Sequence, residues 1–249
     1  MDNLKVIILA AGKGTRLESE KANIPKAMRN AAEKPLLHYV LKSVEFIENK
    51  KDIIIIVGYL KEMITEAFPE YAFAVQDEQL GTGHAAKCAE QEIGDYSGNL
   101  LILLGDMPLI SCESIKNLIE IHKQNNNQCT ILSCNMDKVM SFGRIIRDNN
   151  NNFVKILENR DCPPELKNIK EYNTGVMLFD SKKLFEQLAN LKNNNKSGEY
   201  YLTDVPELFI ENNYKVGVYA TDNKNEFYGI TSKEDIAFIE NILRSNSAK

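Results

Sequence analysis

Six short apolar runs, most of them without polar alternation, constrain the fold of this chain more than any other feature. Continuous runs of this length are typical of strands that are buried on both faces of a sheet. Helical patterns lie between several of them. The runs span residues 6–9, 53–57, 100–104, 130–133, 176–179 and 216–219.

Three segments have the spacing of amphipathic helices. The first follows Pro35, which a first helical turn tolerates, and its stripe covers residues 37–47. The second has Ser111 as its candidate N-cap, and the third opens with a capping box of Thr231 and Glu234. The stripes consist of Leu37, Val40, Leu41, Val44 and Ile47; of Ile115, Leu118, Ile119 and His122; and of Ile236, Ile239, Ile242 and Leu243.

The alternation of strands and helices in the first half predicts right-handed crossovers, with a ligand crevice at the carboxyl ends of the strands. In the second half, segments 143–147 and 153–157 flank a polar run and predict an antiparallel hairpin. Two asparagine clusters, 125–127 and 193–195, are expected to be exposed connections. No repeat or linker is visible, so we expect a single α/β, Rossmann-like three-layer domain with a mixed, mostly parallel central sheet.

Composition excludes several classes of partner. The net charge of −5, with acidic and basic residues interspersed, predicts neither a nucleic-acid nor a membrane partner. No segment approaches the roughly 20 apolar residues that cross a bilayer, and no leader-type segment precedes the first run. Five cysteines form no C-x-x-C pair and leave one unmatched. We therefore expect a reduced, cytoplasmic protein that acts on small molecules.

A glycine-punctuated loop, Leu9 to Arg16, follows the first apolar run. Gly12 and Gly14 let backbone N–H groups approach a phosphate, and Arg16 adds a bidentate cation. The loop matches neither the dinucleotide fingerprint nor the Walker lysine pattern. It therefore predicts a triphosphate site, and a plain tight turn is the alternative.

Three further segments carry candidate chemistry. Asp106 follows the run at 100–104 and should lie at the same sheet edge as the glycine loop, where a single carboxylate can bind Mg²⁺ together with phosphates and water. Lys26, stiffened by Pro25, is a second candidate phosphate cation. The turn from Gln79 to His84 opens a predicted helix and offers donors and acceptors to a base edge. The alternatives are a turn-capping aspartate, a solvated lysine and a core or capping histidine.

Eight motifs, in this order, resemble the uridylyltransferase domain of the bacterial bifunctional N-acetylglucosamine-1-phosphate uridyltransferases, within the sugar nucleotidyltransferase superfamily. The resemblance covers about residues 5–230. The wider superfamily shares only the first loop, the lysine and the aspartate, so the middle motifs carry the narrower assignment. The motifs are LAAGKGTR, IPK, QDEQLGTGHA, LLGDMPLI, FGRIIR, LENRD, EYNTGV and GEYYLTD.

The resemblance implies a nucleotide-diphospho-sugar transferase fold, with a nucleotide-binding part over about residues 1–110, a sugar-binding part over about 111–231 and a C-terminal helix over 232–245. It implies that the catalytic residues are Arg16, Lys26 and Asp106, and that Asp106 binds Mg²⁺. It places the nucleotide against Leu9, Ala11, Gly12, Gly14, Gln76, Gln79, Gly81 and Thr82. It places the acetamido sugar against Gly143, Glu158, Asn173 and Thr203, with Tyr200 nearby.

The sequence departs from the family pattern in three respects. Thr231 stands where the family has an asparagine that helps to bind the metal, so Thr231 is a poor second ligand, and Asp222 and Glu226 are possible substitutes. The loop between Arg16 and Lys26 is slightly longer than in close relatives, which weakens the assignment of UTP and N-acetylglucosamine. No hexapeptide β-helix follows the last helix. Neither acetyltransferase activity nor the trimer that this β-helix builds is expected, and the oligomeric state stays open.

The expected reaction is attack of a sugar 1-phosphate on the α-phosphorus of UTP, which gives UDP-N-acetylglucosamine and pyrophosphate with Mg²⁺ as cofactor. No general base is needed, because the sugar phosphate is already ionised at pH 7. One alternative is the same chemistry with another pair, such as dTTP or CTP with a different sugar or alditol phosphate. The other is a non-catalytic nucleotide-sugar-binding protein, an alternative that Thr231 motivates.

Overall fold

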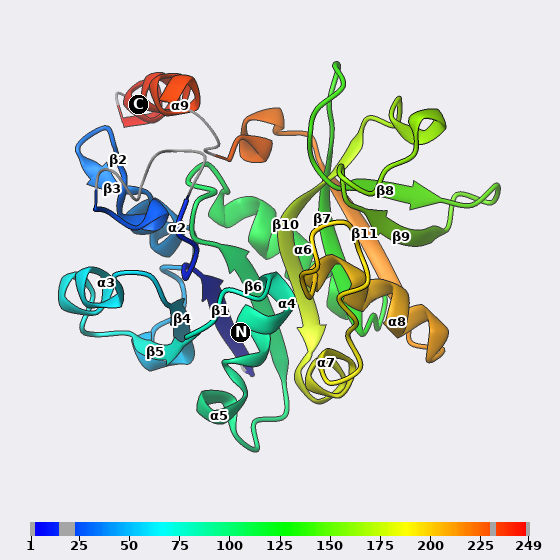
Figure 1. The fold of residues 1–249 in the computed structure, drawn as a ribbon, viewed down its shortest axis with the longest axis horizontal. Coiled ribbons are helices and arrows are strands. Elements are labelled where there is room, and N and C mark those ends of the chain that lie inside the picture. Colours follow the sequence, from blue (N-terminus) through cyan, green and yellow to red (C-terminus); the bar gives the residue numbers. More distant parts are fainter. Residues whose placement is uncertain (1–2, 15–22, 230–232, 248–249) are drawn as a thin grey trace.

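A nine-stranded sheet forms the centre of the computed structural model, which describes residues 3–14, 23–229 and 233–247 (Figure 1). The main path of the sheet runs β11-β7-β10-β6-β1-β4-β5, and β8 and β9 extend it from β10. The strands are β1 (Leu4–Leu9), β4 (Ile53–Val57), β5 (Ala72–Val75), β6 (Asn99–Leu104), β7 (Cys129–Asn135), β8 (Arg144–Arg147), β9 (Phe153–Leu157), β10 (Glu171–Asp180) and β11 (Val216–Thr221).

The sheet is buried on both faces, as the continuous apolar runs predicted. Along β1, Val6 and Ile8 pack into one hydrophobic cluster and Ile7 packs into the other, because successive side chains of a strand point to opposite faces. The first cluster is completed by α2 (Leu36–Ser43), α3 (Lys61–Ala67) and α6 (Cys112–Gln124). The second is completed by α4 (Thr82–Lys87), α5 (Glu90–Ile93), α7 (Ser181–Leu188) and α8 (Val205–Glu211).

The predicted α/β architecture with a mixed, mostly parallel sheet is confirmed. Strand β1 pairs in parallel with β6 and with β4, and β11 pairs in parallel with β7. Along the main path of the sheet, the antiparallel strand is β10, which lies between β6 and β7. In the β1–β6 pair Leu9 lies opposite Leu104, and the backbone N–H of Gly105 donates to the Leu9 carbonyl at 2.9 Å. The loops that follow these two strands therefore begin side by side.

The predicted hairpin is also present, as β8 paired antiparallel with β9. It joins the sheet where Arg144 lies opposite Tyr172 of β10. Just beyond this point the register of β10 against β7 shifts between Asn173 and Met177, and Gly175 adopts φ +82°. Such a bulge bends the strand and redirects its side chains.

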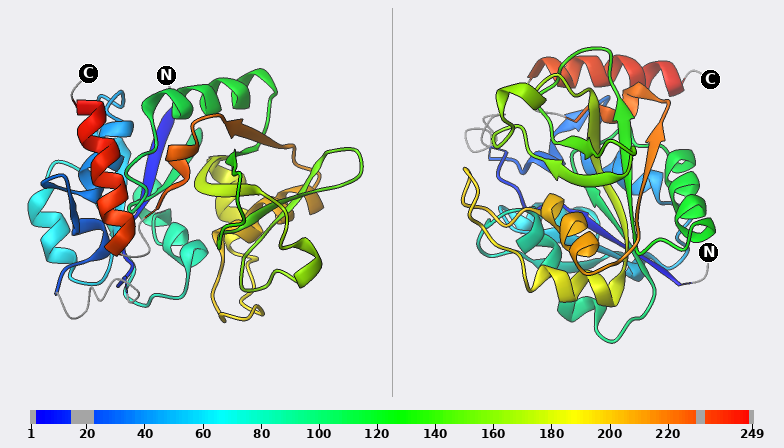
Figure 2. Two further views of the ribbon diagram at one scale, coloured as in Figure 1. Left: turned by 90° about the horizontal axis from the view of Figure 1, so that it is seen from above. Right: turned by 90° about the vertical axis from the view of Figure 1, so that its right-hand side faces the viewer.

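Helix α9 (Lys233–Ser247) packs against the N-terminal part of the chain (Figure 2). Ile239 of this helix forms a small cluster with Ala31 and Leu36. Ala31 belongs to the two-stranded sheet of β2 (Asn30–Ala31) and β3 (Lys34–Pro35), and the Ala32 N–H donates to Glu240 Oε1 at 3.1 Å. The capping box predicted for this helix involves Thr231, which lies outside the described residues.

Several local predictions need correction. Helix α2 ends at Ser43, although its stripe was predicted to run over residues 37–47, because the hydrogen bonds tighten to i→i−3 after Leu41. Pro35 is the N-cap residue and not a first-turn residue. The apolar pattern did not reveal β5 or the β2–β3 hairpin. Ser111 caps α6 as predicted, and its Oγ accepts from the Ser114 N–H at 3.1 Å.

Asn127 is a further correction, because it was expected to lie in an exposed connection. The residue is buried, and its Nδ2 donates to Thr130 Oγ1 at 3.0 Å. The same amide lies against Gly217 of β11, where a Cβ would approach Nδ2 to 2.2 Å. Within the part of the chain that the structure describes, no helix is long and apolar enough to span a bilayer.

We predict that Gly175→Ala lowers the free energy of unfolding by about 3 kcal/mol, because it combines a strained positive φ with overpacking. The added Cβ would lie 2.4 Å from Leu104 Cδ1 and 2.8 Å from Leu104 Cγ. Gly198→Ala is the matched control, since Gly198 has φ +66° with nothing within 4 Å of an added Cβ. Urea denaturation should show a loss of only about 1 kcal/mol for the control. Equal losses in the two variants would contradict the overlap with Leu104.

Candidate functional site

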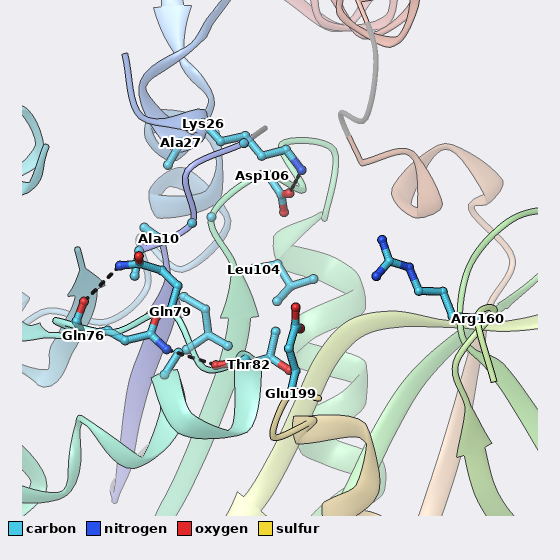
Figure 3. A pocket seen from close by; sticks show the side chains of 17 residues that line it. Ala10, Lys26, Ala27, Gln76, Gln79, Thr82, Leu104, Asp106, Arg160 and Glu199 are labelled. Atoms are coloured by element: carbon cyan, nitrogen blue, oxygen red, sulfur yellow. Dashed lines mark hydrogen bonds and ion pairs between the residues drawn. The ribbon is translucent and has the colours of Figure 1, made fainter. Parts of the chain in front are cut away.

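The carboxyl ends of β1 and β6 border a cavity of about 520 Å³, here named the first cavity (Figure 3). The glycine loop, the segment after β6, the turn before α4 and Lys26 all line it. Every described residue that was predicted to bind nucleotide lies here. They are Leu9, Ala11, Gly12, Gly14, Gln76, Gln79, Gly81 and Thr82.

A second cavity, of about 560 Å³, lies between β8, β9, β10 and the segment 197–203. Four of the five residues predicted to bind sugar line it: Gly143, Glu158, Asn173 and Thr203. The two cavities share the lining residues Thr82, Leu104, Arg160 and Glu199. They are therefore adjacent compartments of one depression.

Lys26 and Asp106 meet in the first cavity, where the Lys26 ammonium donates to Asp106 Oδ2 (Figure 3). Pro25, with φ −58°, directs the chain into a short 3-10 turn (Lys26–Met28). Asp106 lies two residues beyond the end of β6, so two segments 80 residues apart place opposite charges at one point. Gly14 has φ +67°, the conformation for which a glycine was expected in this loop. Arg16, the other predicted cation, lies outside the described residues.

The turn before α4 is fixed from two sides. Buried Gln76 donates to the Gly81 carbonyl at 3.1 Å, and its Nε2 lies 3.1 Å from His84 Nδ1. His84 therefore has the structural role that was its alternative interpretation. Gly81 adopts φ +114°, and a Cβ there would lie 2.5 Å from the Tyr200 carbonyl oxygen. Only glycine fits this close approach of two backbones.

Tyr200 contributes its backbone to this turn. Its N–H donates to the Leu80 carbonyl and its carbonyl accepts from the Gly83 N–H, each at 2.8 Å. Among the described residues that line the second cavity, the tyrosine is Tyr201, the next residue along the chain. Thr82 completes the junction, because its Oγ1 accepts from the Leu202 N–H at 3.0 Å.

Glu158 is the acidic centre of the second cavity. Thr203 Oγ1 donates to its Oε1 at 2.9 Å, and a Cβ at Gly143 would lie 3.2 Å from the same oxygen. Burial raises the pKa of Glu158 above its usual value. The Asn173 Oδ1 accepts from the Gly175 N–H at 3.0 Å, which fixes the amide beside the bulge. The cavity thus offers oriented acceptors and donors to a polyhydroxylated ligand.

Arg160 and Glu199 line both cavities but were not among the residues predicted from the sequence. Both lie inside quoted motifs, LENRD and GEYYLTD, and Arg160 is two residues beyond the predicted ligand Glu158. Their proximity to motif residues was the available signal. Their shared position depends on how β9 and the 195–203 segment pack together.

Asp106 and Glu199 are the carboxylates among the described residues that line the first cavity, and Asp106 is the one that lies beside Lys26. Among the described residues no group of three or more His, Cys, Asp or Glu side chains could hold a metal ion. Neither Asp222 nor Glu226 lines the first or the second cavity. Glu226 is fully buried, and its Oε1 accepts from Ser114 Oγ at 2.9 Å, so it supports the start of α6. Its position does not support the predicted role as a substitute ligand, and Thr231 lies outside the described residues.

Comparisons with known proteins agree with this geometry. Residues 5–227 match the family model described as "Nucleotidyl transferase". The chain is 42% identical over 239 residues to the bifunctional protein GlmU of Streptococcus uberis and to that of Streptococcus thermophilus, covering 96% of this chain and 51% of each relative. The GlmU of Streptococcus agalactiae is 40% identical over 244 residues, with 98% and 52% covered. The chain thus spans about half the length of these curated relatives.

A solved structure shares the fold. It is assigned as a glucose-1-phosphate thymidylyltransferase from Bacillus anthracis in complex with sucrose, and it superposes with a TM-score of 0.78. The alignment covers 97% of this chain and 95% of that one, at 20% sequence identity.

Asp204 generates a prediction about stability. Burial, followed by the charges of Glu207 and Glu158, raises the pKa of Asp204 to about 6. An unfolded aspartate titrates near pH 4, so the folded protein binds the extra proton between about pH 4 and pH 6, and this residue lowers stability as the pH rises through that window. We predict that Asp204→Asn is more stable than the parent chain above pH 6, by about 1 kcal/mol after allowance for solvent screening.

Urea denaturation at pH 4.5, 6.0 and 7.5 measures this difference. The advantage of Asp204→Asn should shrink toward pH 4.5, because the folded parent chain is then largely protonated, and so neutral, at this position. Glu211→Gln, at an exposed residue that ends α8, is the control and should show no such trend. A variant that gains nothing between pH 4.5 and 7.5 would refute the assignment to Asp204.

Proposed function

Because this chain belongs to the nucleotidyl transferase family, we propose that it transfers a uridylyl group from UTP to N-acetylglucosamine 1-phosphate and releases pyrophosphate. The observation that carries the proposal is the convergence of the glycine loop, Lys26 and Asp106 in the first cavity, next to a second cavity that contains Glu158, Asn173 and Thr203. The order of the eight motifs and the GlmU relatives support the choice of substrates.

In the proposed reaction an oxygen of the sugar 1-phosphate attacks the α-phosphorus of UTP in line. The new O–P bond forms as the bond to the bridging oxygen breaks, and pyrophosphate leaves with the electron pair. Both reactants are anions, so the chain must offset their repulsion and align them. Lys26 provides positive charge beside the phosphates, and Arg16 is proposed to do the same from the glycine loop.

The turn before α4 is proposed to recognise the base. Gln76 is buried and held by Gly81 and His84, so its amide is oriented before any ligand arrives. Gln79 donates through Nε2 to the Gln76 carbonyl at 3.3 Å, which orders the other side of the turn. A preorganised polar site of this kind rejects ligands that leave its groups unpaired.

The second cavity is proposed to bind the sugar. Glu158 accepts from Thr203 and retains a second oxygen for a hydroxyl group, and Asn173 retains its amide donors. In this assignment the nucleotide-binding part covers about residues 1–110 and the sugar-binding part about residues 111–231. Thr82 and Leu104 also line the sugar side, and Arg160 and Glu199 also line the nucleotide side.

Magnesium is proposed as the cofactor. Asp106 fits this ion, because carboxylate oxygen is a ligand that Mg²⁺ prefers and the cavity can take phosphate oxygens beside it. The ion would supply additional positive charge to the phosphates when bound. Lys26 contacts the same carboxylate, so the lysine and the proposed metal ligand lie next to each other in the first cavity.

A panel of nucleotides and phosphates tests the substrate assignment. We expect kcat/KM, measured by pyrophosphate release, to be highest for UTP with N-acetylglucosamine 1-phosphate. The competing nucleotides are dTTP and CTP, and the competing acceptors are glucose 1-phosphate and an alditol phosphate. A higher value for another pair would replace the proposed substrates. Absence of labelled pyrophosphate exchange into every nucleotide would favour a binding protein.

Asp106→Asn and Lys26→Met should each lower kcat by about 10²- to 10³-fold, as removal of charge stabilisation at a reacting phosphorus does. Pyrophosphate release measures the effect, and circular dichroism confirms folding. Asp95→Asn and Lys182→Met change exposed residues outside both cavities and should leave kcat unaltered. Near-normal turnover in the first two variants would contradict the proposed roles.

A further inference from the structure

The boundary between the two cavities is where the reacting phosphates must meet, if the proposed function holds. Four residues line both cavities and are here named the seam: Thr82, Leu104, Arg160 and Glu199. A nucleotide in the first cavity and a sugar 1-phosphate in the second would bring the α-phosphate and the attacking phosphate together at the seam. The side chains of the seam are therefore placed to contact the two phosphates.

The charges around the second cavity are unfavourable to an anion without Arg160. Among the described residues that line it, the charged side chains are Glu158, Arg160 and Glu199, so Arg160 is its only cation. Two carboxylates raise the electrostatic cost of bringing a phosphate into this cavity. In the first cavity, Lys26 is already paired with Asp106. Among the described residues that line the second cavity, Arg160 is therefore the side chain placed to offset the charge of a phosphate on the sugar side.

Arg160 is also available, unlike its two neighbours in this part of the chain. Arg144 is 1% exposed and donates to the carbonyls of Met140 and Phe142. Arg147 forms a bidentate pair with Glu171, with both N–O distances at 2.7 Å. Arg160 is exposed, and among the described contacts its guanidinium donates only to Ser197 Oγ, at 3.1 Å.

The backbone of Arg160 is nevertheless well placed. Lys196 Nζ donates to the Arg160 carbonyl at 2.8 Å, and the Lys196 N–H donates to Asp161 Oδ1 at 3.0 Å. These bonds join the turn after β9 to the 195–199 loop. Figure 3 shows the Arg160 guanidinium extending into the cavity from the side opposite Gln76 and Gln79. The side chain thus reaches toward the seam from the sugar side.

We propose that Arg160 binds the phosphate group of the sugar 1-phosphate and orients its attacking oxygen, an inference that rests on the proposed function. Arginine suits this role, because its planar guanidinium donates two parallel hydrogen bonds to a phosphate. Charge compensation is then divided: Lys26 serves the nucleotide and Arg160 serves the acceptor. Arg160 is a catalytic residue in this assignment, since it touches the substrate.

Binding measurements test this role without requiring turnover. Arg160→Met should weaken binding of N-acetylglucosamine 1-phosphate by about 30- to 100-fold in calorimetry with a non-reacting α,β-methylene analogue of UTP present, because a phosphate loses its charged partner. Binding of the analogue itself should change less than twofold. Arg160→Lys should recover part of the affinity. Lys192→Met, at an exposed lysine in the loop after α7 that lines neither cavity, is the control.

The pH dependence provides a signature that a structural role would not give. The second ionisation of a phosphomonoester lies near pH 6. The parent chain should bind the sugar phosphate more tightly as the pH rises through this value, and Arg160→Met should lose most of that gain. Parent-like affinity in Arg160→Met, an equal loss of analogue binding, or no binding by the parent chain would each overturn the inference. A parent chain that binds through Arg160 but never turns over would refute only the proposed function.

Discussion

Parallel pairing of β1 with β6 is the constraint on which the site depends. In this register Leu9 lies opposite Leu104, so the glycine loop and the Asp106 segment leave the sheet side by side at the same edge. The bond from the Gly105 N–H to the Leu9 carbonyl carries this pairing into the loops. Apart from Lys5 in β1 and Asn99 in β6, both strands are apolar and packed on two faces, so a slip in register would expose or misplace an entire strand. The hydrophobic core therefore determines where the polar groups meet.

Electrostatic balance accounts for the charged side chains that line the first cavity. The proposed reaction joins two anions, so it needs positive charge on both sides of the bond that forms, and the chain carries its candidate cations on distant segments. Lys26 begins a short 3-10 turn in the N-terminal part of the chain, and Arg160 follows β9 in the second half. The acids at the same place, Asp106 and Glu199, keep the ligand-free cavity from accumulating net positive charge. With both signs of charge present, the ligand-free cavity has neither a strongly positive nor a strongly negative electrostatic potential.

The sequence predicted the elements of the site better than their relations. The glycine loop, Asp106 and the hairpin were predictable, because each depends on a local pattern that strand and turn chemistry fixes. Arg160 and Glu199 were missed because their importance arises only when two loops pack side by side. The burial of Asn127 was missed for a similar reason. The run of asparagines around it is typical of an exposed loop, but its amide fills the space beside Gly217. The limits of α2 depended on hydrogen-bond geometry that apolar spacing does not encode.

The contact between Gly81 and Tyr200 has a consequence for how such proteins diversify. The turn assigned to the base is held by backbone atoms from the segment that also places Thr203 and Glu199. In the proposed assignment, base and sugar preference are then coupled, because a shift in one segment alters the support of the other. Exchange of only one half between related chains would separate the turn from the segment that supports it. In the proposed assignment, the two preferences are therefore expected to change together.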